Sequence, residues 1–420
     1  MRVLVIGSGG REHAIVWALS RSSGVDKIFC APGNGGIQEL AELVPISVND
    51  FDGLGQFALE KEVGLVVVGP DDPLADGIVD HLQGMGLKVF GPNKAAAQIE
   101  GSKIFMKDLC HKYRIPTAAY ETFDDAERAL TYIREQGAPI VLKADGLAAG
   151  KGVIVAETLE EAEAAIDKIM LQRAFGDAGE RIIVEEFLAG QEVSILAFVD
   201  GDTVRPMIEA QDHKPAYDGD EGPNTGGMGT YAPVPQICRA QLQQAVETII
   251  EPAARAMVQE GRSFSGVLFA GLMMTTDGPR LIEFNARFGD PETQVVLPLL
   301  KTDLFEVLLA TAEGRLDQVE LQWKEGAAVC VILASGGYPT SYEKGFAISG
   351  LDQVDTLVFH AGTKVEAGGA VTNGGRVLGV VATGPDVATA RAKAYEEAVK
   401  IDFEGRHMRS DIALKAALPV

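Results

Sequence analysis

The sequence of 420 residues has few cysteines, no long apolar run and a shortage of basic residues. Its four cysteines lie far apart, without the CxxC spacing or the nearby histidine expected of zinc sites and redox pairs. No stretch approaches the roughly 20 apolar residues of a membrane span, and the short apolar run at the N-terminus predicts a strand rather than a signal peptide. We therefore expect a cytoplasmic protein with no membrane partner.

The charge balance is acidic, because 37 Lys and Arg residues stand against 60 Asp and Glu residues, for a net charge of -23. Such a surface repels phosphate backbones, so the composition argues against a nucleic-acid partner. A small anion is not excluded, since it needs only a local pocket of cations and backbone N–H groups. With 46% apolar residues and no low-complexity tract or internal repeat, the chain is expected to fold into two to four packed units.

Hydrophobic patterning predicts three domains. Residues 1-101 alternate short apolar runs with amphipathic stretches, which is typical of a parallel α/β domain. Residues 102-315 contain a small lobe at about 124-187, then a helix and longer strand runs around a long polar loop at 209-236, which favour an antiparallel sheet. Residues 325-420 begin with the apolar run AAVCVILA and are interpreted as a C-terminal α/β domain. The predicted fold class is therefore α/β and α+β multidomain.

Two glycine-rich segments lie where phosphates are commonly bound. Gly7-Ser8-Gly9-Gly10 follows the first predicted strand and opens a helix, but Glu12 replaces the third glycine of a dinucleotide fingerprint. A small phosphorylated ligand, or merely a tight turn, fits this segment better. The segment GLAAGKGV (146-153) is one residue too short for a Walker loop and has Gly152 where Ser or Thr would bind magnesium. With Lys143 on the incoming strand it predicts a flap over phosphates, the alternative being a flexible surface loop.

The segment LIEFNARFGDPETQ (281-294) combines groups suited to a metal and a phosphate. On a strand, Glu283 and Asn285 point to the same face, and Arg287 follows on that face if the strand continues. A carboxylate, an amide oxygen and a guanidinium aimed at one point are typical of a magnesium-phosphate site. A surface strand with alternating polar groups is the alternative.

Ordered blocks along nearly the whole chain resemble the phosphoribosylamine-glycine ligase family, the glycinamide ribonucleotide synthetases of the ATP-grasp superfamily. The blocks occur in the family's order: GGREHA (9-14), APGNGG (31-36), VVGPDDPL (67-74), EGSK (100-103), KADGLAAGKGV (143-153), EEFLAGQEVS (185-194), QDHK (211-214), GPNTGGMG (222-229), EFNARFGDPETQ (283-294), HAGT (360-363) and TNGGRV (372-377). The resemblance implies an ATP-grasp fold and a role in purine biosynthesis. The implied reaction joins glycine to 5-phosphoribosylamine through glycyl phosphate, with ATP and Mg²⁺ or Mn²⁺, giving glycinamide ribonucleotide, ADP and phosphate. These small molecules are the expected partners, and a monomer is expected rather than a stable oligomer.

The resemblance also implies roles for single residues. Arg287 and Lys143 would be the catalytic groups, and Glu283 and Asn285 would hold the metal. ATP would be bound by Lys103, Lys143, the loop residues Gly146, Gly150, Lys151 and Gly152, the adenine-side residues Glu185, Glu186, Phe187 and Leu188, and the ribose-side Glu192. The other substrates would meet Gly9, Gly10, Arg11, Asn34, Gly69, Pro70, Asp212, Lys214, Asn224, Thr225, Gly226, Gly227 and Arg287.

Two other functions are compatible with parts of this pattern. One is an ATP-grasp ligase that uses formate or bicarbonate, which the segments 211-214 and 222-229 disfavour because they resemble the glycine-using family. The other is a regulatory protein that retains ATP without turnover, which we would expect to lack the lysines, Glu283 or Arg287.

The strand before residue 281 offers no acid until Asp277, so the ligands of a second metal stay open.

Overall fold

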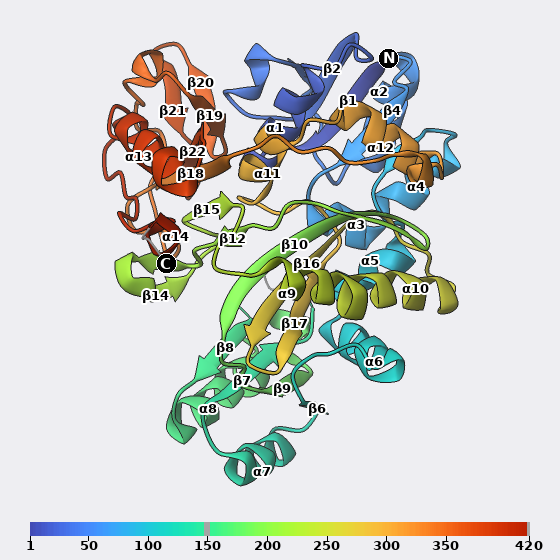
Figure 1. The fold of residues 1–420 in the computed structure, drawn as a ribbon, viewed down its shortest axis with the longest axis vertical. Helices are drawn as coiled ribbons and strands as arrows, with labels where there is room; N and C mark the ends of the chain where they lie inside the picture. The colour runs from blue at the N-terminus through green and yellow to red at the C-terminus, as the bar shows by residue number, and fades with distance from the viewer. Residues whose placement is uncertain (147–151, 418–420) are drawn as a thin grey trace.

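The computed structural model describes residues 1–146 and 152–417. Its N-terminal sheet is parallel, in the order β3-β2-β1-β4-β5 (Figure 1), with strands β1 (Arg2–Gly7), β2 (Lys27–Pro32), β3 (Glu42–Leu43), β4 (Leu65–Val68) and β5 (Val89–Phe90). The accompanying helices are α1 (Gly10–Leu19), α2 (Phe51–Glu60), α3 (Asp71–Asp76), α4 (Ile78–Gly84) and α5 (Lys94–Gly101). Both faces of β1 are buried, Val3 and Val5 in one cluster and Leu4 and Ile6 in another, so the strand is apolar without alternation. The predicted parallel α/β pattern of this region is confirmed.

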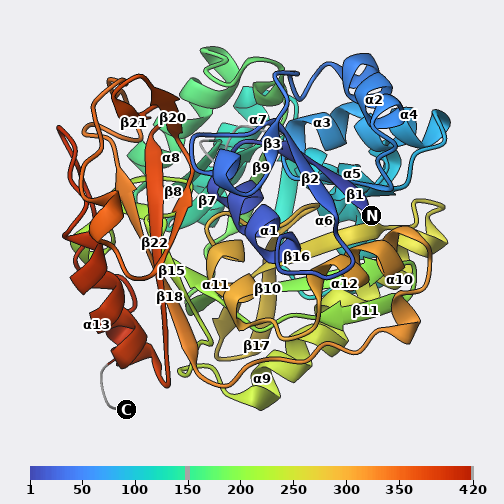
Figure 2. The same cartoon turned by 90° about the horizontal axis from the view of Figure 1, so that it is seen from above.

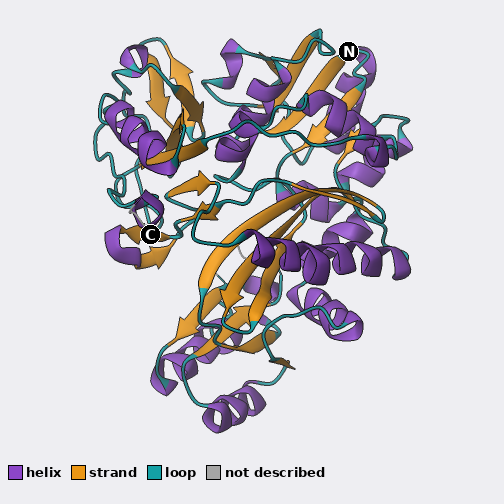
Figure 3. Ribbon diagram, in the orientation of Figure 1, coloured by secondary structure: helices purple, strands orange, loops and turns teal. Residues whose placement is uncertain are grey.

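A small lobe carries an antiparallel sheet in the order β6-β9-β7-β8, built from β6 (Tyr120–Phe123), β7 (Ile140–Ala144), β8 (Val153–Ala156) and β9 (Ile182–Glu186). Helices α7 (Ala126–Gln136) and α8 (Leu159–Ile166) cover one face of it (Figure 3), where they pack on Ile140, Leu142 and Val184. Because side chains alternate along a strand, Lys143 and Glu185 belong to the opposite face.

The central sheet is antiparallel, in the order β11-β10-β16-β17, with strands β10 (Gln191–Asp200), β11 (Thr203–Pro206), β16 (Ser265–Thr275) and β17 (Gly278–Asn285). A helical run formed by α9 (Arg239–Ala245), a π-helical turn (Val246–Ile250) and α10 (Glu251–Gln259) packs on one face through Ile249 and Ala253. Helix α6 (Lys103–Tyr113) connects the N-terminal unit to the small lobe. The other face of the central sheet contributes side chains to the candidate site.

The last sheet has the order β12-β15-β18-β22-β19, with strands β12 (Gln211–Asp212), β15 (Gly229–Ala232), β18 (Ala327–Ala334), β19 (Leu357–His360) and β22 (Arg376–Gly384). Two of its strands come from residues 209-236, which we expected to form one long loop. That expectation was wrong because Gly229–Ala232 is buried and pairs with β18. All of β18 is buried as well, since α13 (Val387–Ala398) covers one face and α11 (Thr293–Leu299) the other (Figure 2).

The remaining elements are short ribbons and helices around these sheets. They include β13 (Pro215–Tyr217) with β14 (Glu221–Asn224), β20 (Thr363–Glu366) with β21 (Gly369–Thr372), and helices α12 (Leu304–Ala312) and α14 (Leu414–Ala417). In the part of the chain that the structure describes, no helix combines the length and apolar character needed to cross a bilayer.

Candidate active site

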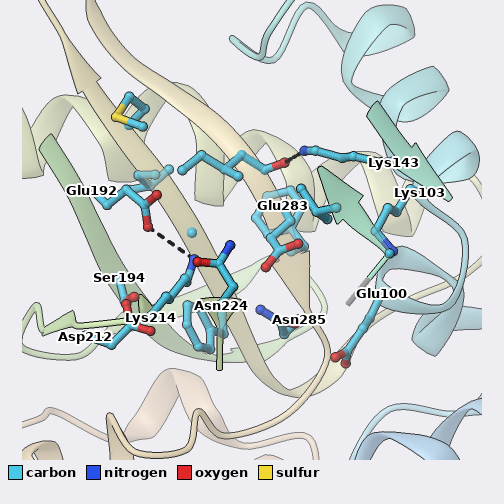
Figure 4. A pocket seen from close by; sticks show the side chains of 18 of the residues that line it. Glu100, Lys103, Lys143, Glu192, Ser194, Asp212, Lys214, Asn224, Glu283 and Asn285 are labelled. Carbon is cyan, nitrogen blue, oxygen red and sulfur yellow. Dashed lines mark hydrogen bonds and ion pairs between the residues drawn. The ribbon is translucent and has the colours of Figure 1, made fainter. Parts of the chain in front are cut away.

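A cavity of about 490 Å³ lies between the small lobe and the face of the central sheet opposite α9 and α10. The small lobe contributes Lys143 to its wall, and the central sheet contributes Glu192, Glu283 and Asn285. Figure 4 shows Lys103 and Lys143 on one side of this space, Glu192 on the other, and Glu283 and Asn285 between them. The cavity thus collects charged groups from segments far apart in the sequence.

Both lysines predicted to meet phosphates lie in the cavity wall. Lys103, the first residue of α6, donates a hydrogen bond to the Gly146 carbonyl (2.6 Å), and burial lowers its pKa. Lys143 is 3% exposed and donates to the Ile282 carbonyl (3.2 Å). It also pairs with Oε2 of Glu185 (3.0 Å), whose Oε1 is buried with no hydrogen-bond partner among the described residues.

Glu283 and Asn285 both line the cavity, as their spacing on β17 predicted. A bulge precedes them, since Gly271 pairs with Glu283 while the next residue of β16 pairs with Leu281. Ile282 is therefore the extra residue, and its carbonyl is free to accept from Lys143. Burial alone would raise the pKa of Glu283, but the charges of Lys214, Lys143 and other nearby cations outweigh it and lower the pKa. An ionised carboxylate and an amide side chain therefore lie together in the cavity wall.

This pair of donors suits a magnesium ion that is held partly by a substrate. Glu283 and Asn285 supply hard oxygen ligands. Across residues 1–146 and 152–417 there is no group of three or more His, Cys, Asp and Glu side chains placed to hold a metal. Mg²⁺ commonly takes one or two carboxylates from the protein and completes its shell with phosphates and water. The residues present therefore fit a metal that arrives with a phosphate.

A second charged group lies across the cavity from the two lysines. Lys214 donates to Oε2 of Glu192 (3.1 Å), and Asp212 lies nearby (Figure 4). Burial alone would lower the pKa of Lys214, but the carboxylates of Glu192, Asp212 and Glu283 outweigh it and raise the pKa. Burial, and then the charge of Asp212, raise the pKa of Glu292 to about 8. The site therefore holds a firmly charged ammonium and a carboxyl group that keeps its proton near neutral pH.

Arg287 reaches the cavity by a different route from the one predicted. Strand β17 ends at Asn285, so Arg287 lies in the bend after the strand. Its guanidinium pairs with Glu100 (3.0 Å), lies 3.8 Å from the carboxylate of Asp71, and donates to Oδ1 of Asn285 (3.4 Å). Its Nε is buried and lacks a hydrogen-bond partner within the described part of the chain. Burial raises the pKa of Glu100 even though the positive charge of Arg287 opposes this.

The residues predicted to receive adenine and ribose line the same cavity, namely Glu185, Glu186, Phe187, Leu188 and Glu192. The carboxylate of Glu186 accepts the N–H of Ala119 (2.9 Å), and Phe187 is 42% exposed. Gly146 and Gly152 also lie in the wall. Gly150 and Lys151, predicted to cover phosphates, lie outside the described residues.

The predicted residues for the other substrates divide into two groups. Those in the cavity wall are Arg11, Asp212, Lys214, Asn224, Thr225, Gly226 and Arg287. Among the described residues, the ones that the wall does not include are Gly9, Gly10, Asn34, Gly69, Pro70 and Gly227. The amide of Asn34 is fully engaged within the protein, since it donates to the carbonyls of Ser8 (2.9 Å) and His360 (2.8 Å) and accepts from Gly36 and Ile37. It ties the N-terminal turns to β19.

An ion pair that we had not predicted joins three parts of the molecule beside the cavity. Arg376, at the start of β22, pairs with Asp290 (3.2 Å) and donates to the Gly226 carbonyl (2.6 Å). The carboxylate of Asp290 also accepts the backbone N–H of Arg11 (3.2 Å). Sequence reasoning assigned no role to the cavity residues Glu100, Asp290 and Glu292, and it left Arg376 open as a ligand clamp or an ordinary surface cation. All four lie inside the blocks that carry the family resemblance, which was the available signal.

Comparison with known proteins agrees with this architecture. Models of the phosphoribosylglycinamide synthetase N domain, ATP-grasp (A) domain and C domain match residues 1–100, 101–293 and 328–415. The phosphoribosylamine–glycine ligase of Halalkalibacterium halodurans is 56% identical over 99% of this chain and 97% of its own length. The crystal structure of the ligase of that name from Thermotoga maritima has 35% identity and a TM-score of 0.87, over 98% of this chain and all of that one. The biotin carboxylase domain of Hydrogenobacter thermophilus 2-oxoglutarate carboxylase, solved with MgADP, shares the fold at 16% identity and a TM-score of 0.72, over 97% of this chain and 91% of that one. The chain therefore belongs to the phosphoribosylglycinamide synthetase family, the phosphoribosylamine–glycine ligases.

Proposed function

We propose that this chain joins glycine to 5-phosphoribosylamine in purine biosynthesis, with conversion of ATP to ADP and phosphate and release of glycinamide ribonucleotide. Family membership supports the reaction. The observation that carries the proposal is the placement of two lysines, Lys103 and Lys143, beside the oxygen donors Glu283 and Asn285 in one cavity. Cations beside hard oxygen donors are what phosphoryl transfer from a magnesium-bound nucleotide requires.

The chemistry requires two steps, because a carboxylate is a poor electrophile whose charge repels an attacking amine. First, a carboxylate oxygen of glycine forms a bond to the terminal phosphorus of ATP, and the bond from that phosphorus to ADP breaks. Second, the amine of phosphoribosylamine attacks the carbonyl carbon of the glycyl phosphate. Phosphate then leaves with the former glycine oxygen, and the new amide nitrogen loses one proton. No covalent bond to the enzyme is needed.

Specific residues support each step. Lys103 and Lys143 neutralise charge that spreads over the transferring phosphoryl group. Glu283 and Asn285 would hold Mg²⁺ or Mn²⁺, which would supply further neutralisation of phosphate charge. Arg287 holds the glycine carboxylate and then the acyl phosphate, because a planar guanidinium can bridge two oxygens.

The sugar phosphate and amine are assigned to the other end of the cavity. Arg11, Asp212, Lys214 and the segment 224-227 would hold them, together with the N-terminal turns at Gly9, Gly10, Gly69 and Pro70. We also propose that residues 124-187 act as a lid over the nucleotide and that the three units 1-101, 102-315 and 325-420 are the domains of the molecule. Support for the lid comes from the separate apolar core of this lobe.

The release of ADP tests the reaction. We expect full ADP release only when glycine and phosphoribosylamine are both present, and formate or bicarbonate should not replace glycine. ATP binding without turnover under any of these conditions would support the regulatory alternative instead. Glycine labelled with oxygen-18 in its carboxylate must pass one labelled oxygen to the released phosphate. Unlabelled phosphate from fully labelled glycine would rule out the glycyl phosphate.

A further inference from the structure

One buried lysine near the nucleotide end of the cavity has no role in the proposed mechanism. Lys107 lies on α6, one helical turn after Lys103 and therefore on the same side of the helix. It is completely buried, and it is absent from the set of residues that line the cavity wall. Its ammonium lies 3.1 Å from Oε2 of Glu185, the oxygen that Lys143 approaches to 3.0 Å. Two lysines thus share one carboxylate oxygen.

The hydrogen bonds of the two lysines differ. Lys107 has three donors, and it is also bonded to Oγ1 of Thr117 (2.8 Å) and the carbonyl of Ala118 (3.4 Å). All its donors are therefore used inside the protein. Within residues 1–146 and 152–417, Lys143 donates to one carbonyl, that of Ile282, and pairs with Glu185, which leaves one of its three donors for a ligand in the cavity. Lys107 is fixed, whereas Lys143 has capacity to bind.

The charges explain why a second buried lysine is useful. A single ammonium would neutralise Glu185, and a second one is unfavourable in a dry site, where burial lowers the pKa of Lys107. If Lys143 alone balanced Glu185, its approach to a phosphate would leave a buried carboxylate unpaired. Removing one partner from a buried ion pair is strongly destabilising. Nucleotide binding would then have to oppose that penalty.

We propose that Lys107 is the permanent counter-ion of Glu185, a positioning residue that leaves the charge of Lys143 available to the phosphates of ATP. This inference rests on the proposed nucleotide site. With Lys107 in place, Glu185 stays paired and keeps its orientation when Lys143 shifts toward a phosphate. Without Lys107, Glu185 competes with the nucleotide for Lys143.

Calorimetric titration of variants with MgATP tests this competition. Lys107→Met removes the charge at nearly the same length, and we expect it to weaken MgATP binding by at least about tenfold. In a Glu185→Gln background, where there is no carboxylate to balance, the same substitution should weaken binding less than about threefold. Lys112→Met is the matched control on the same helix, because Lys112 is 63% exposed and pairs with Glu260 on the surface. This substitution should leave MgATP affinity unchanged.

The outcomes separate a charge effect from a packing effect. An equal loss in both backgrounds, or no loss in either, would overturn the role of Lys107. If Lys107→Met does not fold, as judged by thermal unfolding, Lys107→Gln retains a hydrogen-bond donor without the charge and allows the same comparison. Lys143→Met provides the independent check. If it binds MgATP like the unmodified protein, the proposed nucleotide site is wrong, whereas weak binding by Lys143→Met with normal binding by Lys107→Met removes only the counter-ion inference.

Discussion

Replacing Arg287 by lysine should reduce turnover about a hundredfold and leave MgATP affinity nearly unchanged. The guanidinium contacts Glu100 (3.0 Å) and Oδ1 of Asn285 (3.4 Å) at once, and its Nε is unused by the described residues. Its planar shape therefore lets it stay anchored on Glu100 while it donates to a second anion. A lysine ammonium at this position would stay paired with the buried carboxylate of Glu100, and it would therefore be unavailable to the acyl phosphate. The loss of one preorganised donor of this kind corresponds to about 2.7 kcal/mol of activation free energy.

The assay is ADP release at saturating glycine and phosphoribosylamine, with MgATP affinity measured separately by calorimetry. Arg280→Lys is the matched control, because Arg280 lies on the same strand, donates to the Thr117 carbonyl (3.2 Å) and is absent from the cavity wall. Turnover of Arg287→Lys within about threefold of the unmodified protein would refute the reasoning. An equal loss in Arg280→Lys would assign the effect to the strand rather than to the guanidinium.

Three further predictions use other groups of the molecule. Glu283→Ala should abolish ligation without changing the melting temperature much, because it removes a hard ligand and opens no core; near-normal turnover at ordinary Mg²⁺ would place the metal elsewhere. The pKa of Glu292 is raised from 4.5 to about 8 by burial and then by Asp212, so its stabilising contribution is full below about pH 4.5 and is lost as the pH rises to about 8. The urea midpoint should therefore fall less steeply with pH over that range in Glu292→Gln than in the unmodified protein. An unchanged slope of urea midpoint against pH would contradict the raised pKa of Glu292. Asn34→Ala should lower the free energy of unfolding by about 1–3 kcal/mol in urea titrations, since it leaves buried partners unsatisfied; the exposed Asn49→Ala is the control, and an equal effect of both would remove the special role of Asn34.

Much of the fold was accessible from the sequence, because burial on one or both faces of a strand leaves a clear pattern. The uninterrupted apolar run of β18 results from helices on both sides of it. The alternation along β17 predicted correctly that Glu283 and Asn285 share a face. The strands at 211–212 and 229–232 were missed because they are short, and only the pairing of β15 with β18, and of β12 with β15, makes them strands.

The site was less accessible, since a sequence shows which groups exist but not what they already contact. Asn34 looked like a ligand-binding residue, yet its amide bonds are all satisfied inside the protein. Sequence analysis did not single out Lys107, because its approach to Glu185 depends on how α6 is placed beside β9 in the folded chain. The turn-forming residues Gly289, Asp290 and Pro291 follow Arg287, but the bend that sets its position begins before them, at 286–287.

The position of β12 and β15 in the last sheet affects how the chain can be made. These strands leave the ribosome well before β18, the strand that β15 pairs with, so their outer hydrogen-bonding groups wait for partners during synthesis. A truncated chain that ends before β18 would keep this edge open, and an unpaired strand edge is a template for association with other chains. The middle of the protein is consequently completed only when β18 joins the last sheet. An engineered split of the chain between residues 315 and 325 would separate β15 from β18, two strands that must fold together.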